Sequence, residues 1–195
     1  MKVVALAVLL SLAAPAFADP KPWRSEITEP DRKRLAGLWR AWTTARAQVG
    51  ASGHADAWAR EEPLTDPAAG AGGDAPPPGR YRCRTVKLGT RTIGMPVWTM
   101  SATYPCRVEQ VEGGLRFVRE GGAQRTAGML FADGDRQVYL GALSLGSERG
   151  LFAYNADAER NQVGVLRRLG DARWRLELPW PKWESTLDVI DIVPA

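Results

Sequence analysis

Residues 79–88, Gly-Arg-Tyr-Arg-Cys-Arg-Thr-Val-Lys-Leu, are the point at which the pattern of this sequence changes. Arginines at 80, 82 and 84 alternate with Tyr81, Cys83 and Thr85, a period of two that is typical of a β-strand. The apolar phase then shifts at Val86 and Leu88, which predicts a β-bulge. Helix and loop patterns precede this stretch and strand patterns follow it, so we expect it to be the first strand of an all-β body.

The chain beyond residue 88 is a series of short strand patterns separated by turn signals. Gly113-Gly114 is a two-residue hairpin signal, and Asp133-Gly134 and Gly170-Asp171-Ala172 mark two further turns. The expected strands span residues 80–88, 106–112, 115–120, 124–131, 136–145, 162–169, 173–178 and 187–193. Residues 95–104 are ambiguous, because Pro96 interrupts an apolar run.

This order of strands predicts a mainly β fold, an antiparallel up-and-down β-barrel of about eight strands, because closure removes exposed sheet edges. A β-sandwich is the alternative. Residues 138–145 are apolar on both faces, which requires a cover outside the barrel. The expected organisation is an N-terminal helical segment at 19–62, a Pro/Gly-rich linker at 63–79, and a β-barrel domain at 80–195 that folds with the helix as one unit.

An amphipathic pattern over residues 29–49 predicts the helix that supplies this cover. Thr28 is a suitable N-cap with Asp31 three residues on, and Gly50 is a natural stop. The apolar stripe consists of Leu35, Leu38, Trp39, Trp42, Ala45 and Val49. We expect this stripe to dock onto the barrel; a face that binds a partner protein is the alternative.

The first eighteen residues have the pattern of a signal peptide. Lys2 precedes an apolar run, and Ala16-Phe17-Ala18 resembles a cleavage site, so cleavage at Ala18/Asp19 is predicted. The run is shorter than the roughly 20 residues that a membrane span needs. The sequence therefore predicts a periplasmic or secreted protein with no transmembrane segment in the mature chain.

Two cysteines in an exported chain predict one disulfide, between Cys83 and Cys106. No metal site is expected, because His54 is the only histidine and lies in a polar, Gly-flanked stretch. The formal net charge of +4 falls by one when the leader with Lys2 is removed, which is too small an excess to favour nucleic-acid binding.

Several motifs resemble those of a known family. They are Pro-Pro-Pro-Gly-x-Tyr-Arg-Cys-Arg-Thr-x-Lys-Leu-Gly at 76–89, Gln124-Arg125, Leu140-Gly141-x-Leu143-x-Leu145-Gly146, the run from Arg173 to Pro181, Glu184-Ser185 and Leu187-Asp188-Val189-Ile190. Together they resemble a bacterial family known only as a domain of unknown function, DUF4893, over most of residues 30–195. That resemblance implies an exported protein and carries over no activity or site residues. Gly79-Arg80-Tyr81 is more weakly similar to the first strand of calycins, the lipocalins and periplasmic barrel protease inhibitors.

The sequence contains no catalytic or cofactor motif, since it has no Gly-x-Ser-x-Gly elbow and no phosphate-binding loop in the correct context. Candidate binding residues lie in Pro179–Glu184, where Trp180 and Trp183 beside Glu184 suit stacking on a sugar or contact with a partner. Burial of both indoles as a plug of one barrel end is the alternative. Arg82, Arg84, Arg125 and Arg160 are candidates for an anion-binding mouth, or are simply outward strand positions.

These observations favour a non-enzymatic, periplasmic binding or inhibitor-like module that meets a small apolar ligand or a protein at the barrel interior or mouth. One alternative is a cell-envelope enzyme that acts on glycans through Glu159 or Glu184. The other is a structural envelope protein whose barrel is filled. A cavity above about 300 Å³ would favour the binding module.

Overall fold

A computed structural model describes residues 22–70 and 73–195. The predicted signal peptide at 1–18 lies outside these residues. The described helices are α1 (Trp23–Glu26), α2 (Glu29–Ala36), α3 (Leu38–Ala51) and α4 (Ala55–Arg60). None of them is long and apolar enough to cross a membrane.

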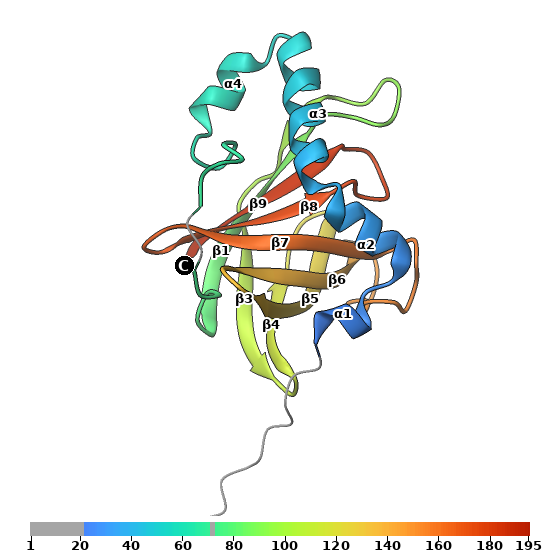
Figure 1. Ribbon diagram of the computed structural model, residues 1–195, viewed down its shortest axis with the longest axis vertical. Coiled ribbons are helices and arrows are strands. Elements are labelled where there is room, and N and C mark those ends of the chain that lie inside the picture. The colour runs from blue at the N-terminus through green and yellow to red at the C-terminus, as the bar shows by residue number, and fades with distance from the viewer. Residues whose placement is uncertain (1–21, 71–72) are drawn as a thin grey trace, which may run out of the picture.

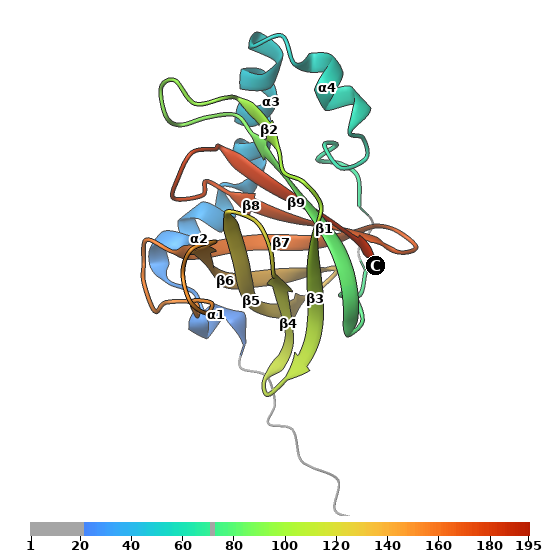
Figure 2. The same cartoon turned by 180° about the vertical axis from the view of Figure 1, so that it is seen from behind.

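The described residues that follow α4 form an antiparallel β-barrel (Figures 1 and 2). Its strands are β1 (Gly79–Leu88), β3 (Tyr104–Val111), β4 (Gly114–Arg119), β5 (Gln124–Asp133), β6 (Arg136–Leu145), β7 (Asn161–Gly170), β8 (Arg173–Pro179) and β9 (Leu187–Pro194). Each strand pairs with the next, and β1 pairs with β9 to close the eight-stranded barrel. A ninth, short strand, β2 (Trp98–Met100), adds to the far half of β1. The up-and-down barrel predicted from the sequence is confirmed.

The strands of this barrel bury apolar side chains on both faces. The interior cluster includes Tyr81, Phe117, Tyr139 and Trp174, whereas Val86 and Leu88 belong to a second cluster between the barrel and the helices. β1 pairs with β9 without a register shift from Tyr81 to Leu88. The predicted bulge at Val86 is therefore wrong. The apolar phase changes there because the helices cover the outer face of the far half of β1, where Val86 and Leu88 are buried, whereas Thr85 and Lys87 face inward.

The cover is the predicted amphipathic segment, which lies across the outside of the barrel (Figure 1). It is two helices rather than one, because α2 ends at Gly37 and α3 begins after it. The carbonyl of Gly37 accepts a hydrogen bond from Trp180 Nε1, and a Cβ at this position would lie 2.9 Å from that nitrogen. A tertiary contact thus determines the break between the helices.

The buried helix stripe consists of Leu35, Leu38, Trp42, Ala45 and Val49. Trp39 was expected in this stripe, and that expectation is wrong, since 66% of its surface is exposed. Trp42 instead lies against the barrel and donates from Nε1 to Glu177 Oε2 at 3.0 Å. The helices therefore dock onto the barrel through Trp42, and the indole of Trp39 points away from the barrel into solvent.

The Pro/Gly-rich segment, predicted as a linker, is attached to the barrel at two places. Arg175 is fully buried and donates to the carbonyls of Pro63, Leu64, Asp66 and Ala69. Further along, Tyr81 donates to the carbonyl of Pro77, and Trp174 Nε1 donates to the carbonyl of Asp74. Both aromatic rings belong to the interior cluster, so residues 73–79 cover one end of the barrel.

Candidate functional site

The barrel interior is built in layers along its axis. At the end covered by residues 73–79 it is apolar: Tyr81 packs edge-on against Trp174, with ring centroids 5.9 Å apart, and the Cys83–Cys106 disulfide lies beside them. The middle layer is Tyr139, whose hydroxyl lies 2.6 Å from Thr126 Oγ1, which in turn donates to Gln162. Burial raises the pKa of the Tyr139 hydroxyl, so it stays protonated. Beyond this layer the interior becomes polar.

Glycines at two inward positions make room for the middle layer. A Cβ at Gly141 would lie 2.1 Å from the Tyr139 hydroxyl oxygen, and one at Gly128 would lie 2.6 Å from the Tyr139 ring. The phenol therefore extends across neighbouring strands inside the barrel. It separates the apolar end from the open end.

The open end of the barrel contains a cavity of about 390 Å³, which we call the mouth cavity. Its walls come from β1, β2, the start of β3, the end of β4 and the 184–185 turn. The lining residues are Thr85, Lys87, Met95, Pro96, Thr99, Met100, Ser101, Ala102, Tyr104, Arg119, Ala123, Gln124, Glu184 and Ser185. A volume of this size falls within the range of small-molecule sites.

Arg119 is the most unusual residue of the mouth cavity. Only 5% of its surface is exposed, and among the described residues no carboxylate lies within 4.0 Å of its guanidinium. Nη1 donates to the carbonyl of Gln124 and Nη2 to Ser101 Oγ, while Nε has no partner within residues 22–70 and 73–195. The guanidinium also lies 4.9 Å from the ring centroid of Tyr104. Burial lowers the pKa of Arg119, and the more distant charge of Asp188 offsets this effect only in part.

The segment between β2 and β3 contains Ser101, which contacts both Arg119 and Thr85. Ser101 lies between β2 and β3, where its backbone N–H donates to the carbonyl of Thr85 and its Oγ accepts from the Thr85 N–H. The same oxygen accepts from Arg119. The hydroxyl of Thr85 is buried and has no partner among the described residues. Two polar groups of this wall, Arg119 Nε and Thr85 Oγ1, are thus unsatisfied, which is rare in folded proteins.

Lys87 is the other cation of the lining, and unlike Arg119 it is paired with carboxylates. Its Nζ lies 3.0 Å from Glu184 and 3.2 Å from Asp188, whose other oxygen accepts from Ser185. Burial lowers the pKa of Lys87, but the carboxylates of Asp188 and Glu184 outweigh this effect and leave the pKa above its ordinary value. Lys87 is therefore a protonated, ion-paired cation.

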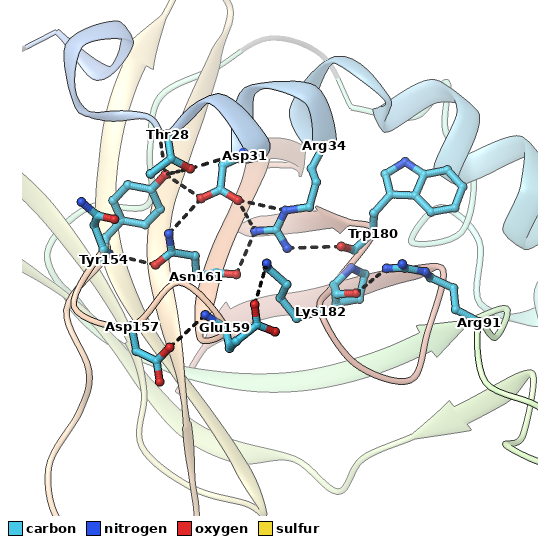
Figure 3. A network of polar contacts seen from close by, with 12 residues as sticks. Thr28, Asp31, Arg34, Arg91, Tyr154, Asp157, Glu159, Asn161, Trp180 and Lys182 are labelled. Carbon is cyan, nitrogen blue, oxygen red and sulfur yellow. Dashed lines mark hydrogen bonds and ion pairs between the residues drawn. The ribbon is translucent and has the colours of Figure 1, made fainter.

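Loops around the open end are tied to α2 by a network centred on Asp31 (Figure 3). One carboxylate oxygen accepts from Arg34 at 2.6 Å; the other accepts from Tyr154 at 2.7 Å and Asn161 at 3.1 Å. Arg34 also donates to the carbonyl of Trp180. Burial raises the pKa of Asp31, but the hydrogen bond from Tyr154 and the charge of Arg34 outweigh it, so the pKa lies below its ordinary value. The network holds the 153–161 and 180–184 loops in place.

None of the four arginines predicted as an anion-binding mouth lines the mouth cavity. Arg82 contacts the carbonyl of Pro194, and Arg84 is paired with Glu61 and Asp191. Arg125 donates to the carbonyls of Leu145, Glu148 and Gly150. Arg160 is paired with Glu148 and Asp157 and borders an adjoining, smaller cavity of only about 20 Å³.

The two tryptophans of the 179–184 segment are both partly buried. Trp180 has a positive φ of 49° and packs against the helices, with Arg40 5.5 Å from its ring centroid. Trp183 lines the smaller cavity, with Arg160 5.0 Å from its ring centroid. Glu184 belongs to the mouth cavity itself, where it accepts from Gln124 and pairs with Lys87.

The two carboxylates considered for glycan chemistry line two adjoining cavities, which share Lys87 and Gln124. Glu159 pairs with Lys182 and borders the smaller cavity, whereas Glu184 borders the mouth cavity. No group of three or more His, Cys, Asp or Glu side chains that suits a metal ion occurs in residues 22–70 and 73–195.

Sequence reasoning missed Arg119 and Lys87, although strand phase carries a signal for both. Lys87 has the same inward phase as Tyr81, Cys83 and Thr85, and Arg119 the same phase as Phe117. A charged residue at an apolar, inward phase is unusual and indicates a site. Three of the arginines expected at the mouth, Arg82, Arg84 and Arg125, lie on the outward phase of their strands, and Arg160 lies in the turn before β7.

Comparison with family models gives a match over residues 23–192 to "Domain of unknown function (DUF4893)". The chain belongs to this family. Searches of curated proteins and of solved structures found no match.

Proposed function

We propose that this member of the DUF4893 family is a binding module that holds a small ligand in the mouth cavity. The observation that carries the proposal is the cavity of about 390 Å³ with two buried side-chain atoms, Arg119 Nε and Thr85 Oγ1, that have no partner among the described residues. Two other hollows, of about 400 Å³ beside α2 and α3 and about 530 Å³ beside residues 74–81, have no such groups in their linings. Small-molecule sites are typically concave, with apolar walls and a few convergent polar groups. A periplasmic or secreted location, which the leader at 1–18 predicts, and a calycin-like use of the barrel mouth are consistent with this role.

The cavity wall has the mixed character of a ligand site. Met95, Pro96 and Met100 supply apolar surface, and methionine adapts its shape to different ligands. Lys87, Glu184 and Ser185 supply polar groups held by the framework. The glycan-hydrolase alternative has less support, because each of its two carboxylates is paired with a lysine and the cavity that Glu159 borders holds only about 20 Å³.

A cavity-filling variant tests this proposal. Ala123 is exposed on the rim of the mouth cavity, so Ala123→Trp should block it without disturbing the core. Ala47→Trp, on the exposed face of α3, is the matched control. In a thermal-shift screen with a library of small organic molecules, compounds should stabilise the wild type and Ala47→Trp but not Ala123→Trp. If no compound separates the rim variant from the control, the proposal is wrong.

A further inference from the structure

Arg119 indicates which ligand chemistry the mouth cavity takes. We propose that the cavity binds a monoanionic carboxylate that carries an apolar group, with the carboxylate against Arg119 and the apolar group along Met95, Pro96 and Met100. This inference rests on the proposed function, because it names the ligand class of the same cavity.

The first argument is the unbalanced charge of Arg119. A buried guanidinium is normally paired with a carboxylate, and the other charged groups of the lining follow that rule: Lys87 pairs with Glu184 and Asp188. Arg119 has two neutral acceptors, the Gln124 carbonyl and Ser101 Oγ, and no counter-charge in contact. An anion in the cavity would supply that counter-charge, and hydrogen bonds between ions are the strongest that a protein makes.

The second argument is the pair of neutral side chains, Thr85 and Tyr104, that lines the cavity with Arg119. Thr85 Oγ1 lines the same cavity and has no partner among the described residues. A hydroxyl can donate to a carboxylate oxygen next to the arginine. Tyr104 stacks near the guanidinium and limits its movement, so the arginine is held in one orientation before a ligand binds.

The third argument sets the charge of the ligand. Glu184 lies in the same lining, and its carboxylate disfavours a second negative charge nearby. A carboxylate brings one charge, whereas a phosphate monoester brings between 1.5 and 2 at pH 7, by analogy with phosphorylated side chains (about −1.5 to −2). The site therefore favours a carboxylate over a phosphate.

Three probes share an eight-carbon alkyl group and differ only in the head group: octanoate, octyl phosphate and 1-octanol. Isothermal titration calorimetry with these probes separates the contribution of the carboxylate from that of the alkyl group. We expect octanoate to bind at least about tenfold tighter than 1-octanol, which corresponds to about 1.4 kcal/mol. Octyl phosphate should bind between the two. Octyl phosphate binding tighter than octanoate would overturn the assignment to a carboxylate.

The matched variants are Arg119→Met and Arg125→Met. Arg125 also has no ion pair and an unpartnered Nε, but it is not in the lining of the mouth cavity. Arg119→Met should remove the preference for octanoate over 1-octanol, and Arg125→Met should keep it. If Arg119→Met folds poorly, Arg119→Lys is the second variant. Because it retains the positive charge, it should keep part of the preference for octanoate over 1-octanol.

The outcomes distinguish this inference from the proposed function. If octanoate and 1-octanol bind the wild type equally, and Ala123→Trp abolishes both, the cavity binds ligands but the carboxylate assignment is wrong. If none of the three probes binds and no library compound distinguishes Ala123→Trp from its control, both are wrong.

Discussion

The two ends of the barrel differ in how their interior side chains are packed and how their polar groups are paired. At the covered end, Tyr81, Phe117 and Trp174 pack together, and residues 73–79 accept the indole and phenol hydrogen bonds. At the open end the same strands present Lys87 and Arg119, and the space between the walls is a cavity. Two neighbouring inward positions of β4 illustrate this difference, since Phe117 is fully buried in the core and Arg119 is buried without a counter-charge.

The comparison indicates that stability and binding occupy different halves of one barrel. Burial of aromatic side chains stabilises the covered end, whereas an unpaired guanidinium costs free energy at the open end. Binding sites commonly retain such costs because the ligand offsets them. The predictions below separate the two ends by their effects on the free energy of unfolding.

Phe117→Ala should have the largest effect. The side chain is fully buried and packs edge-on against Tyr139, with ring centroids 6.4 Å apart, so its loss leaves a cavity in the core. We expect the free energy of unfolding to fall by about 3–5 kcal/mol in denaturant melts. Phe152→Ala, at a partly buried loop position, is the control and should cost much less. Equal losses at both positions would contradict a packed covered end.

Removal of the Cys83–Cys106 disulfide should have the next largest effect. The bond joins β1 to β3 near the covered end and closes a loop with a sequence separation of 23. The chain-entropy model gives about 3.5 kcal/mol for a loop of this length. The double variant Cys83→Ala/Cys106→Ala should lose most of that stability, and reduction of the wild type should lower its melting temperature to a similar degree. Because both cysteines are buried, reduction is carried out in denaturant before refolding, and free thiols in the unfolded, unreduced wild type would show that the bond is absent.

Asp31→Asn should destabilise the loops that frame the open end. The change removes the charge that Arg34 faces at 2.6 Å, so we expect a loss of about 2–3 kcal/mol. Because the folded-state pKa of Asp31 is below its ordinary value, the carboxylate stabilises the fold above the unfolded-state pKa. That stability is lost as the pH falls through the folded-state pKa.

Melting temperatures of the wild type and Asp31→Asn across acidic pH check this sign. The difference between the two proteins should be constant near neutral pH and should shrink as the solution becomes more acidic. Asp157→Asn is the control, because Asp157 lies in the same loop region but is paired with Arg160 at the longer distance of 3.8 Å. A gap that widens toward acid would contradict the role of Asp31.

Arg119→Met should have the smallest effect on stability and is the sharpest test of the comparison. It removes a buried, uncompensated charge, so the free energy of unfolding without ligand should stay within about 1 kcal/mol of the wild type or rise. Phe117→Ala, two positions earlier on the same face, supplies the contrast. A loss of several kcal/mol in Arg119→Met would show that the arginine stabilises the barrel and would remove the reason for assigning it to a ligand.

Strand phase and turn chemistry made much of this fold predictable. Alternation in β1 and β8, and the glycine turns at 113–114 and 133–134, are local signals, and they indicated the order and approximate bounds of the strands. The two cysteines indicated the disulfide because they allow only one pairing within the chain. The bulge at Val86 and the burial of Trp39 were wrong because each depends on which face the helices cover.

The candidate site was predictable only in part. The sequence by itself determined that the chain has a barrel whose strands are apolar on two faces, because periodicity is a property of neighbouring residues. Only the tertiary structure decided that Arg119 faces Ser101 and Thr85 across a break between β2 and β3, that Gly37 ends a helix against Trp180, and that Arg175 holds the segment at 63–69. These contacts join residues far apart in the sequence. Whether a buried charge has a counter-charge depends on which strands and loops meet at one end of the barrel, and no local pattern carries that information.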